Sequence, residues 1–173
     1  YAGYKALFAH GVTELACLAH ARRKFFDLHA ANQSPIAAEA LRRIGELYDV
    51  ERQAQGMDAV GRRQLRAQEA RPRLEALRTW LIDTRIGVAD GGGTAKALDY
   101  SIKRWPALMR YADSGVLPVD NNPVENAIRP IAIGKKNWLF AGSERAGKRA
   151  AAIQSLLGTA KLNGLDPQAW LRD

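Results

Sequence analysis

Residues 118–143 combine a carboxylate with basic and aromatic side chains in a spacing that suits phosphate chemistry. Glu125 is expected in the first turn of a helix that starts at Asn122, and Asp120 lies just before that helix. Asn, Pro and Glu at these positions form a capping box, and Arg129 follows one turn later as an ion-pair partner. A carboxylate beside phosphate-binding groups is also a ligand for a divalent cation. Both interpretations of Glu125, as a helix cap and as a metal ligand, stay open.

A basic segment with two aromatic residues comes next. Lys135 and Lys136 offer point charges for phosphates, while Trp138 and Phe140 offer faces on which a base or sugar can stack. The alternative is that both aromatic rings alternate into a core and that the lysines are solvated. Ser143 suits the N-cap of a helix whose first backbone amides favour a phosphate. That helix opens with a second basic cluster, formed by Arg145, Lys148 and Arg149.

The cysteine and histidine residues do not form a zinc site. Cys17 and His20 have the spacing of half a site, but only His10 and His29 remain as further histidines, and the chain has one cysteine. Structural zinc needs four ligands, so we expect a buried cysteine at the end of a strand and a histidine that caps the next helix. A single cysteine excludes an internal disulfide. The sequence also lacks a phosphate-binding glycine loop, a dinucleotide fingerprint and a nucleophile elbow.

The bulk composition favours a polyanionic partner. The 173 residues carry a net charge of +8, with an otherwise ordinary 47% of hydrophobic and 25% of charged residues. Such a positive charge favours a nucleic acid as the partner, and an anionic membrane second. The alternative is a basic surface that only keeps the protein soluble. Apolar runs stay well short of the roughly 20 residues that span a bilayer. The chain starts without an initiator Met and without a signal peptide, as expected of a fragment.

Periodicity predicts a mostly α-helical chain with one or two short strands. Residues 12–18 are the strand candidate, and their partner is either residues 138–141 or a strand outside this chain. Ser34 and Asp58 are expected N-caps, as is Thr94, and Pro72 is expected to kink or divide its helix. Helices are expected over residues 20–31, 35–54, 60–82, 94–105, 106–113, 122–130 and 145–162, with a short one after Pro167.

Four motifs, in this order, resemble the C-terminal part of insertion-sequence-sixty-six-type transposases. They are Cys17-Leu-Ala-His20-Ala-Arg-Arg-Lys-Phe25, Asp120-Asn-Asn-Pro-Val-Glu125-Asn-Ala-Ile-Arg129-Pro, Gly134-Lys-Lys-Asn-Trp-Leu-Phe-Ala-Gly-Ser143 and Ala160-Lys-Leu-Asn-Gly-Leu-Asp-Pro167. The resemblance implies an RNase H-like catalytic domain with an Asp-Asp-Glu triad that holds Mg²⁺ or Mn²⁺. It also implies cleavage of DNA at element ends and joining of the 3′-hydroxyl to a target. The triad Glu maps onto Glu125.

The resemblance also implies an organisation in three parts. Residues 1–33 are expected to form the last strand and a helix of the RNase H-like core, and residues 34–115 a helical insertion. Residues 116–173 are expected to hold the Glu-bearing helix, the basic segment and the C-terminal helices of the core. Both aspartates of the triad are expected upstream of Tyr1, so this chain by itself is expected to be inactive.

In the intact protein, the expected roles are metal binding and catalysis for Glu125 and structural support for Cys17, His20 and Asn122. The expected DNA-binding residues are Arg129, Lys135, Lys136, Trp138, Arg145, Lys148 and Arg149. The expected partners are DNA and further copies of the protein, without a membrane, in the bacterial cytoplasm at the nucleoid. The competing hypothesis is a non-enzymatic, basic, helical DNA-binding module in which Glu125 is only a cap. A helical protein–protein adaptor with incidental basicity is a third.

Overall fold

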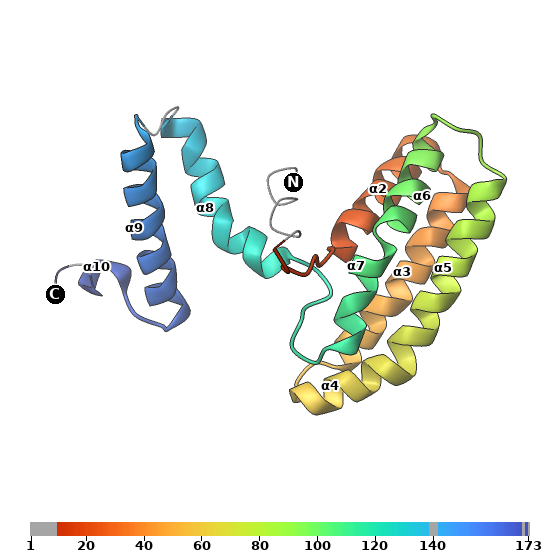
Figure 1. Cartoon of the computed structure of the whole chain (residues 1–173), viewed down its shortest axis with the longest axis horizontal. Coiled ribbons are helices and arrows are strands. Elements are labelled where there is room, and N and C mark those ends of the chain that lie inside the picture. The colour runs from red at the N-terminus through yellow and green to blue at the C-terminus, as the bar shows by residue number, and fades with distance from the viewer. Residues whose placement is uncertain (1–9, 139–141, 171, 173) are drawn as a thin grey trace. The chain divides into compact units, whose positions relative to one another are not determined.

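The computed structural model describes residues 10–138, 142–170 and 172. These residues are mostly helical, as the sequence predicts, and no strand occurs among them. The chain forms two compact units, Tyr1–Asn121 and Asn122–Asp173 (Figure 1). The three-part division expected for the intact protein stays a prediction.

Four helices of the first unit form an antiparallel bundle. They are α2, Leu18–Asn32; α3, Pro35–Gln53; α5, Arg71–Ile86; and α6, Gly93–Lys103. Each helix packs against the next one along the chain, and α6 closes the ring against α2 (Figure 1). The short α4, Ala59–Leu65, leads from α3 towards α5. Such a ring buries one face of every helix around a single core.

Apolar residues at helical spacing form this core. Phe25, Leu47 and Leu98 are each 0% exposed, and Ile44 and Leu77 are 2% exposed. Each such side chain contributes about 1.5–3 kcal/mol when it is fully removed from water. The helical spacing of Ile44 and Leu47 on α3 therefore places both side chains in this core.

In the first unit, the helix starts follow local capping chemistry at two of the three predicted positions. The Ser34 hydroxyl accepts a hydrogen bond from the Ala37 amide at 3.3 Å, and the Asp58 carboxylate accepts one from the Gly61 amide at 2.7 Å. Both caps are confirmed. The cap predicted at Thr94 is wrong, because α6 begins one residue earlier and its N-cap is a glycine.

The interruption predicted near Pro72 is confirmed, and it takes the form of a π-helical turn. This turn spans Arg66–Ala70 and joins α4 to α5. Proline lacks an amide hydrogen and its ring crowds the carbonyl four residues earlier, which is that of Gln68 in this turn. A π turn widens the helix at that point and relieves the crowding.

The strand predicted over residues 12–18 is wrong. Residues 12–17 have no regular structure, and α2 begins at Leu18. The segment is held by two backbone bonds of 3.2 Å, from the Ala16 amide to the Ala107 carbonyl and from the Leu18 amide to the Val119 carbonyl. The partner strand expected over residues 138–141 is not formed at Trp138, which is helical. Residues 139–141 lie outside the described residues. Alternate amides bond outward, as in a strand, but their acceptors are a helix and a loop.

Ala107 belongs to α7, Trp105–Met109, which continues into a 3₁₀ turn, Arg110–Asp113. Together they confirm the helix predicted over residues 106–113. Leu108 and Tyr111 face the bundle core. This packing places the chain after Asp113 beside the first turn of α4.

The second unit contains α8, Asn122–Trp138; α9, Glu144–Leu162; and α10, Pro167–Trp170. The expectation that Pro130 ends its helix is wrong, because α8 continues for eight more residues. An interior proline costs on the order of 3 kcal/mol, so the neighbouring sequence must compensate for it. The apolar spacing that starts at Val124 continues through Pro130 without a break, which favours one helix.

The N-cap predicted for α9 is confirmed, and the helix ends at a glycine in the left-handed conformation. The Ser143 hydroxyl accepts a hydrogen bond from the Ala146 amide at 3.1 Å. At the other end, Gly164 adopts φ +71°, and the Leu165 amide bonds to the Ala160 carbonyl at 2.9 Å. Across the described residues, every helix is too short or too polar to cross a membrane.

One charged side chain, Arg66, is buried in the first unit at 1% exposure. Its Nε and Nη2 donate to the two carboxylate oxygens of Glu51 at 2.8 and 2.6 Å. Its Nη1 donates to the backbone carbonyls of Tyr111 at 3.1 Å, Leu117 at 2.8 Å and Ser114. Each of the three guanidinium nitrogens therefore donates to an acceptor, and the charge is paired with Glu51, as burial of a charge requires.

We expect Arg66→Ala to lower the free energy of unfolding by about 3–5 kcal/mol, because it leaves the Glu51 carboxylate and three carbonyls without their donor. Urea unfolding followed by circular dichroism measures this change. The exposed Arg78 of α5 is the control, and Arg78→Ala should stay within about 0.5 kcal/mol. A loss below about 1 kcal/mol for Arg66→Ala would contradict the role assigned to this network.

Candidate functional site

Glu125 lies in the first turn of α8, and its side chain is exposed. Asn122 begins the helix, within one residue of the predicted start, and the exposed Arg129 follows Glu125 one turn later. A carboxylate at a helix N-terminus is favoured by the helix dipole. A long helix also holds its first-turn side chains in a defined direction, so the position suits a ligand as well as a cap.

The loop before α8, residues 114–121, is bonded to the bundle. At its start, the Ser114 hydroxyl accepts the amides of Val116 and Leu117, both at 3.2 Å. Gly115 has no room for a side chain, because a Cβ there would lie 1.7 Å from the Ala59 carbonyl oxygen. Its carbonyl accepts a bond of 2.9 Å from Arg62 Nη1. The 114–121 loop is therefore pressed against the first turn of α4.

The end of the 114–121 loop is bonded to α2 and α3. The Asn121 amide donates to Cys17 Sγ at 3.2 Å, and Asp120 hydrogen-bonds to the Tyr48 phenol. Burial, and then the negative charge of Asp120, raise the pKa of Tyr48 to about 12. Tyr48 thus stays protonated as a donor over the whole neutral range.

The positions of Cys17 and His20 differ from those predicted. Cys17 is the residue before α2 rather than the end of a strand, and its sulfur accepts a bond from the 114–121 loop. His20 is the third residue of α2, so the expected capping role is wrong for it. The sequence pattern placed His20 correctly near a helix start, but it could not show what either residue contacts.

The described residues contain no group of three or more His, Cys, Asp or Glu side chains that could hold a metal ion. Glu125 offers the type of oxygen that Mg²⁺ and Mn²⁺ prefer. A divalent ion needs several such ligands, so Glu125 fits as one member of a ligand set.

The predicted basic cluster on α9 is brought together by the structure. Arg145, Lys148 and Arg149 are exposed and line one shallow hollow of about 690 Å³ with Ser143 and Glu144. Lys148 forms an ion pair of 2.7 Å with Glu144. The hollow lies at the N-terminus of a 19-residue helix, where backbone amides and the helix dipole add to the positive field. The arrangement suits a phosphate group.

The other predicted DNA contacts lie on or after α8. Lys135 and Lys136 belong to its last turns, and Trp138 is its final residue. Phe140 lies outside the described residues.

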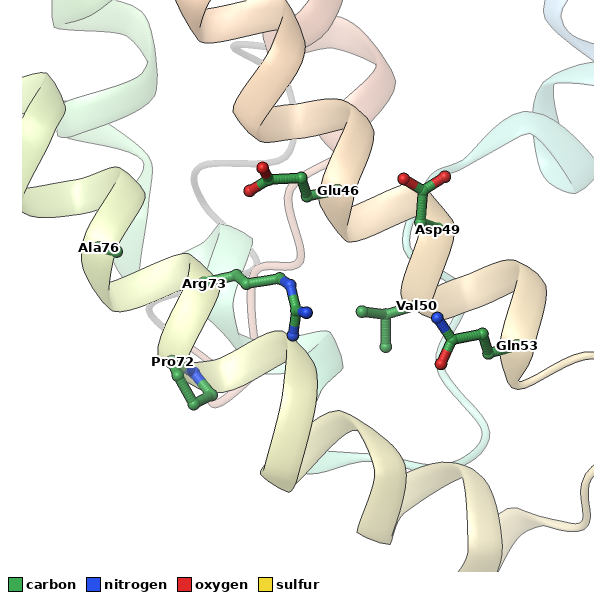
Figure 2. Close-up of a pocket in the computed structure, with 7 residues that line it drawn as sticks. All are labelled: Glu46, Asp49, Val50, Gln53, Pro72, Arg73 and Ala76. Atoms are coloured by element: carbon green, nitrogen blue, oxygen red, sulfur yellow. The ribbon is translucent and has the colours of Figure 1, made fainter.

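A second hollow, of about 640 Å³, lies between α3 and α5 in the first unit (Figure 2). Its lining includes Glu46 and Asp49 from α3 and Arg73 from α5, and Figure 2 shows Arg73 extending toward α3. Each of these charges has an ion-pair partner: Arg42 for Glu46, Arg52 for Asp49 and Glu69 for Arg73. The lining charges are neutralised in pairs, so this hollow is a weaker candidate for a site.

Sequence reasoning missed the residues that hold the 114–121 loop. Arg66 and Tyr48 lie within helical patterns that also contain many ordinary arginines and apolar residues. Their partners are distant in sequence, and no local motif marks them. Gly115 carried a weak signal, since a Ser-Gly pair marks a turn, but a turn signal does not reveal the close approach of Ala59.

Comparisons with known proteins give matches to one family along nearly the whole chain. The model described as "Transposase IS66 family" matches residues 1–149, and the model described as "IS66 C-terminal element" matches residues 155–173. The chain is 36% identical over 174 residues to the protein named "Uncharacterized protein y4hP" of Sinorhizobium fredii (strain NBRC 101917 / NGR234), across 94% of this chain and 32% of that protein. It is 37% identical over 180 residues to "Uncharacterized protein y4jD" of the same strain, across 100% of this chain and 35% of that protein. The chain thus spans about a third of the length of the curated relatives it matches, and no solved structure matches it.

The raised pKa of Tyr48 predicts a loss of stability at high pH. Because the folded pKa is about 12 and the ordinary value is 10.0, the stabilisation is complete below pH 10.0 and disappears as the pH rises through about 12. Unfolding free energies measured across this range should fall less steeply for Tyr48→Phe than for the unmodified chain. Asp120→Asn should lower the pKa of Tyr48 in a phenolate absorbance titration, since it removes a negative charge. An unchanged titration would contradict the contact.

Proposed function

Because the chain belongs to the IS66 family of transposases, we propose that it is part of an enzyme that cleaves DNA at element ends and joins the 3′-hydroxyls to a target. The proposed chemistry is metal-dependent phosphoryl transfer. The observation that carries it is the exposed Glu125, in the first turn of a 17-residue helix that directly follows a firmly bonded loop.

Glu125 is proposed as one ligand of Mg²⁺ or Mn²⁺. The other ligands are proposed to be two aspartates upstream of Tyr1 in the intact protein, within an RNase H-like core. When bound, the metal supplies activation of a water or hydroxyl and neutralisation of charge at the phosphate. The carboxylate of Glu125 holds a defined position through its helix, and this chain alone is proposed to be inactive.

DNA is the proposed partner of the second unit, and the intact enzyme is proposed to self-associate on paired ends. The cluster on α9, with Arg145, Lys148 and Arg149, has the exposure and the helix-terminal position that a backbone phosphate needs. Arg129, Lys135 and Lys136 are proposed as further phosphate contacts. Trp138 is proposed to contact DNA as well. Cys17, His20 and Asn122 are proposed to support the fold around Glu125.

We expect Glu125→Gln in the full-length transposase to abolish cleavage of a plasmid that carries the element's own ends, with little change in DNA affinity. Glutamine keeps the size of the side chain but is a poor ligand for Mg²⁺. The control is Glu75→Gln at an exposed position of α5, which should retain cleavage. Cleavage by Glu125→Gln at the rate of the unmodified enzyme would favour the non-enzymatic DNA-binding module instead.

The triple variant Arg145→Ala, Lys148→Ala and Arg149→Ala should bind DNA with a weaker salt dependence. Each lost phosphate contact lowers the slope of log affinity against log salt by about 0.9, so a total change of roughly 2–3 is expected. A control variant removes the same charge from exposed positions in the first unit: Arg63→Ala, Arg78→Ala and Lys96→Ala. Equal slopes for the two triple variants would show that net charge, and not this cluster, binds DNA.

A further inference from the structure

The 114–121 loop is attached to the bundle at most of its residues. Arg66 bonds the carbonyls of Ser114 and Leu117, and Arg62 bonds that of Gly115. The Val119 carbonyl accepts the amide of Leu18 at 3.2 Å. The last two residues are held by side chains, Asp120 by Tyr48 and Asn121 by Cys17. These bonds hold the loop to the bundle along most of its length.

The attachments come from separate parts of the bundle. Arg62 belongs to α4, Arg66 to the π-helical turn and Tyr48 to α3, while Cys17 directly precedes α2. The bonded pairs are far apart in sequence, by 51 residues for Arg66 and Leu117 and by 104 residues for Cys17 and Asn121. The position of the loop is therefore determined by the assembled bundle rather than by local turn chemistry.

The loop also lacks room to move toward α4. Val119 is 8% exposed, and Gly115 lies so close to Ala59 that a methyl group would overlap its carbonyl. Asn121, the last bonded residue, is joined directly to the first residue of α8. Glu125 follows within one helical turn.

We propose that the helical bundle serves to fix the 114–121 loop, and that Tyr48, Cys17 and Arg66 are positioning residues for Glu125. This inference rests on the proposed function of Glu125 as a metal ligand. Ligands must be held closely, because a displacement of about 1 Å at a reacting centre can reduce the rate by about 100-fold. The attachments fix the chain up to Asn121, the residue from which α8 starts, and Glu125 follows four residues later.

Single substitutions can loosen the end of the loop without unfolding the bundle. Tyr48→Phe removes one hydroxyl, and Cys17→Ala removes the acceptor of the Asn121 amide. Cys17→Ser keeps an acceptor at that position and serves as the conservative rescue. Tyr100→Phe is the matched control, because Tyr100 is a half-buried tyrosine of α6 whose ring lies between Lys24 and Arg104, away from the loop.

The test measures exchange and turnover on the same full-length transposase variants. Hydrogen exchange by mass spectrometry should rise at least about tenfold in peptides from residues 114–125 of Tyr48→Phe and Cys17→Ala, with the core of α3 and α5 unchanged. Turnover of end cleavage should fall by about 10- to 100-fold, while the dissociation constant for DNA changes less than about twofold. Cys17→Ser and Tyr100→Phe should resemble the unmodified enzyme in both measurements.

Unchanged exchange in both Tyr48→Phe and Cys17→Ala would overturn the inference, whatever the activity. Raised exchange with unchanged turnover would overturn it as well, since the loop would then be loose without consequence for the reaction. Cleavage retained by Glu125→Gln in the same assay would overturn the proposed function, and the positioning role with it. The exchange arm does not depend on activity, so the two failures can be told apart.

Discussion

The structure of the first unit depends on one buried guanidinium. Arg66 can be removed from water only if every one of its donors finds an acceptor. Glu51 on α3 supplies two acceptors, and three backbone carbonyls between Tyr111 and Leu117 supply the rest. This requirement joins α3, the π-helical turn and the chain after α7 through a single side chain.

The two units use their basic residues differently. In the bundle, many arginines are paired with acidic neighbours, as Arg42 is with Glu39 and Arg85 with Asp99. The hydrogen bond from Arg42 lowers the pKa of Glu39 to about 2, so this pair stays charged at neutral pH. Residues 122–173 instead carry twice as many lysines and arginines as acidic residues. Each unit therefore carries half of the net charge of +8, but the second unit concentrates its half in 52 residues, against 121 residues in the first.

The errors of the sequence-based predictions have a common physical cause. Residues 12–18 form a short, mostly apolar run like that of a strand, and alternate amides do bond outward, but a helix and a loop accept those bonds. Pro130 breaks the hydrogen-bond pattern of a helix, and α8 continues through it because the residues on both sides share one apolar spacing. In each case the preference of a few residues was opposed by interactions beyond them, which are distant backbone acceptors in the first case and the apolar spacing of the whole helix in the second. The caps at Ser34, Asp58 and Ser143 were predictable because their partners lie three residues away.

The sequence by itself determined the helical class, the family, the identity of Glu125 as the candidate ligand and the basic cluster at the start of α9. Those features consist of local motifs or of spacing within one helix, so they can be recognised without knowing which helices meet. Only the tertiary structure decided how the 114–121 loop is held. That loop is contacted by Arg66, Tyr48 and Cys17, each of which lies 48 or more residues away from its partner in the sequence. The shortest of these separations is the one between Arg66 and Ser114. The physical reason is that a buried donor or acceptor must find a partner, and the partner is supplied by the packing of the whole bundle.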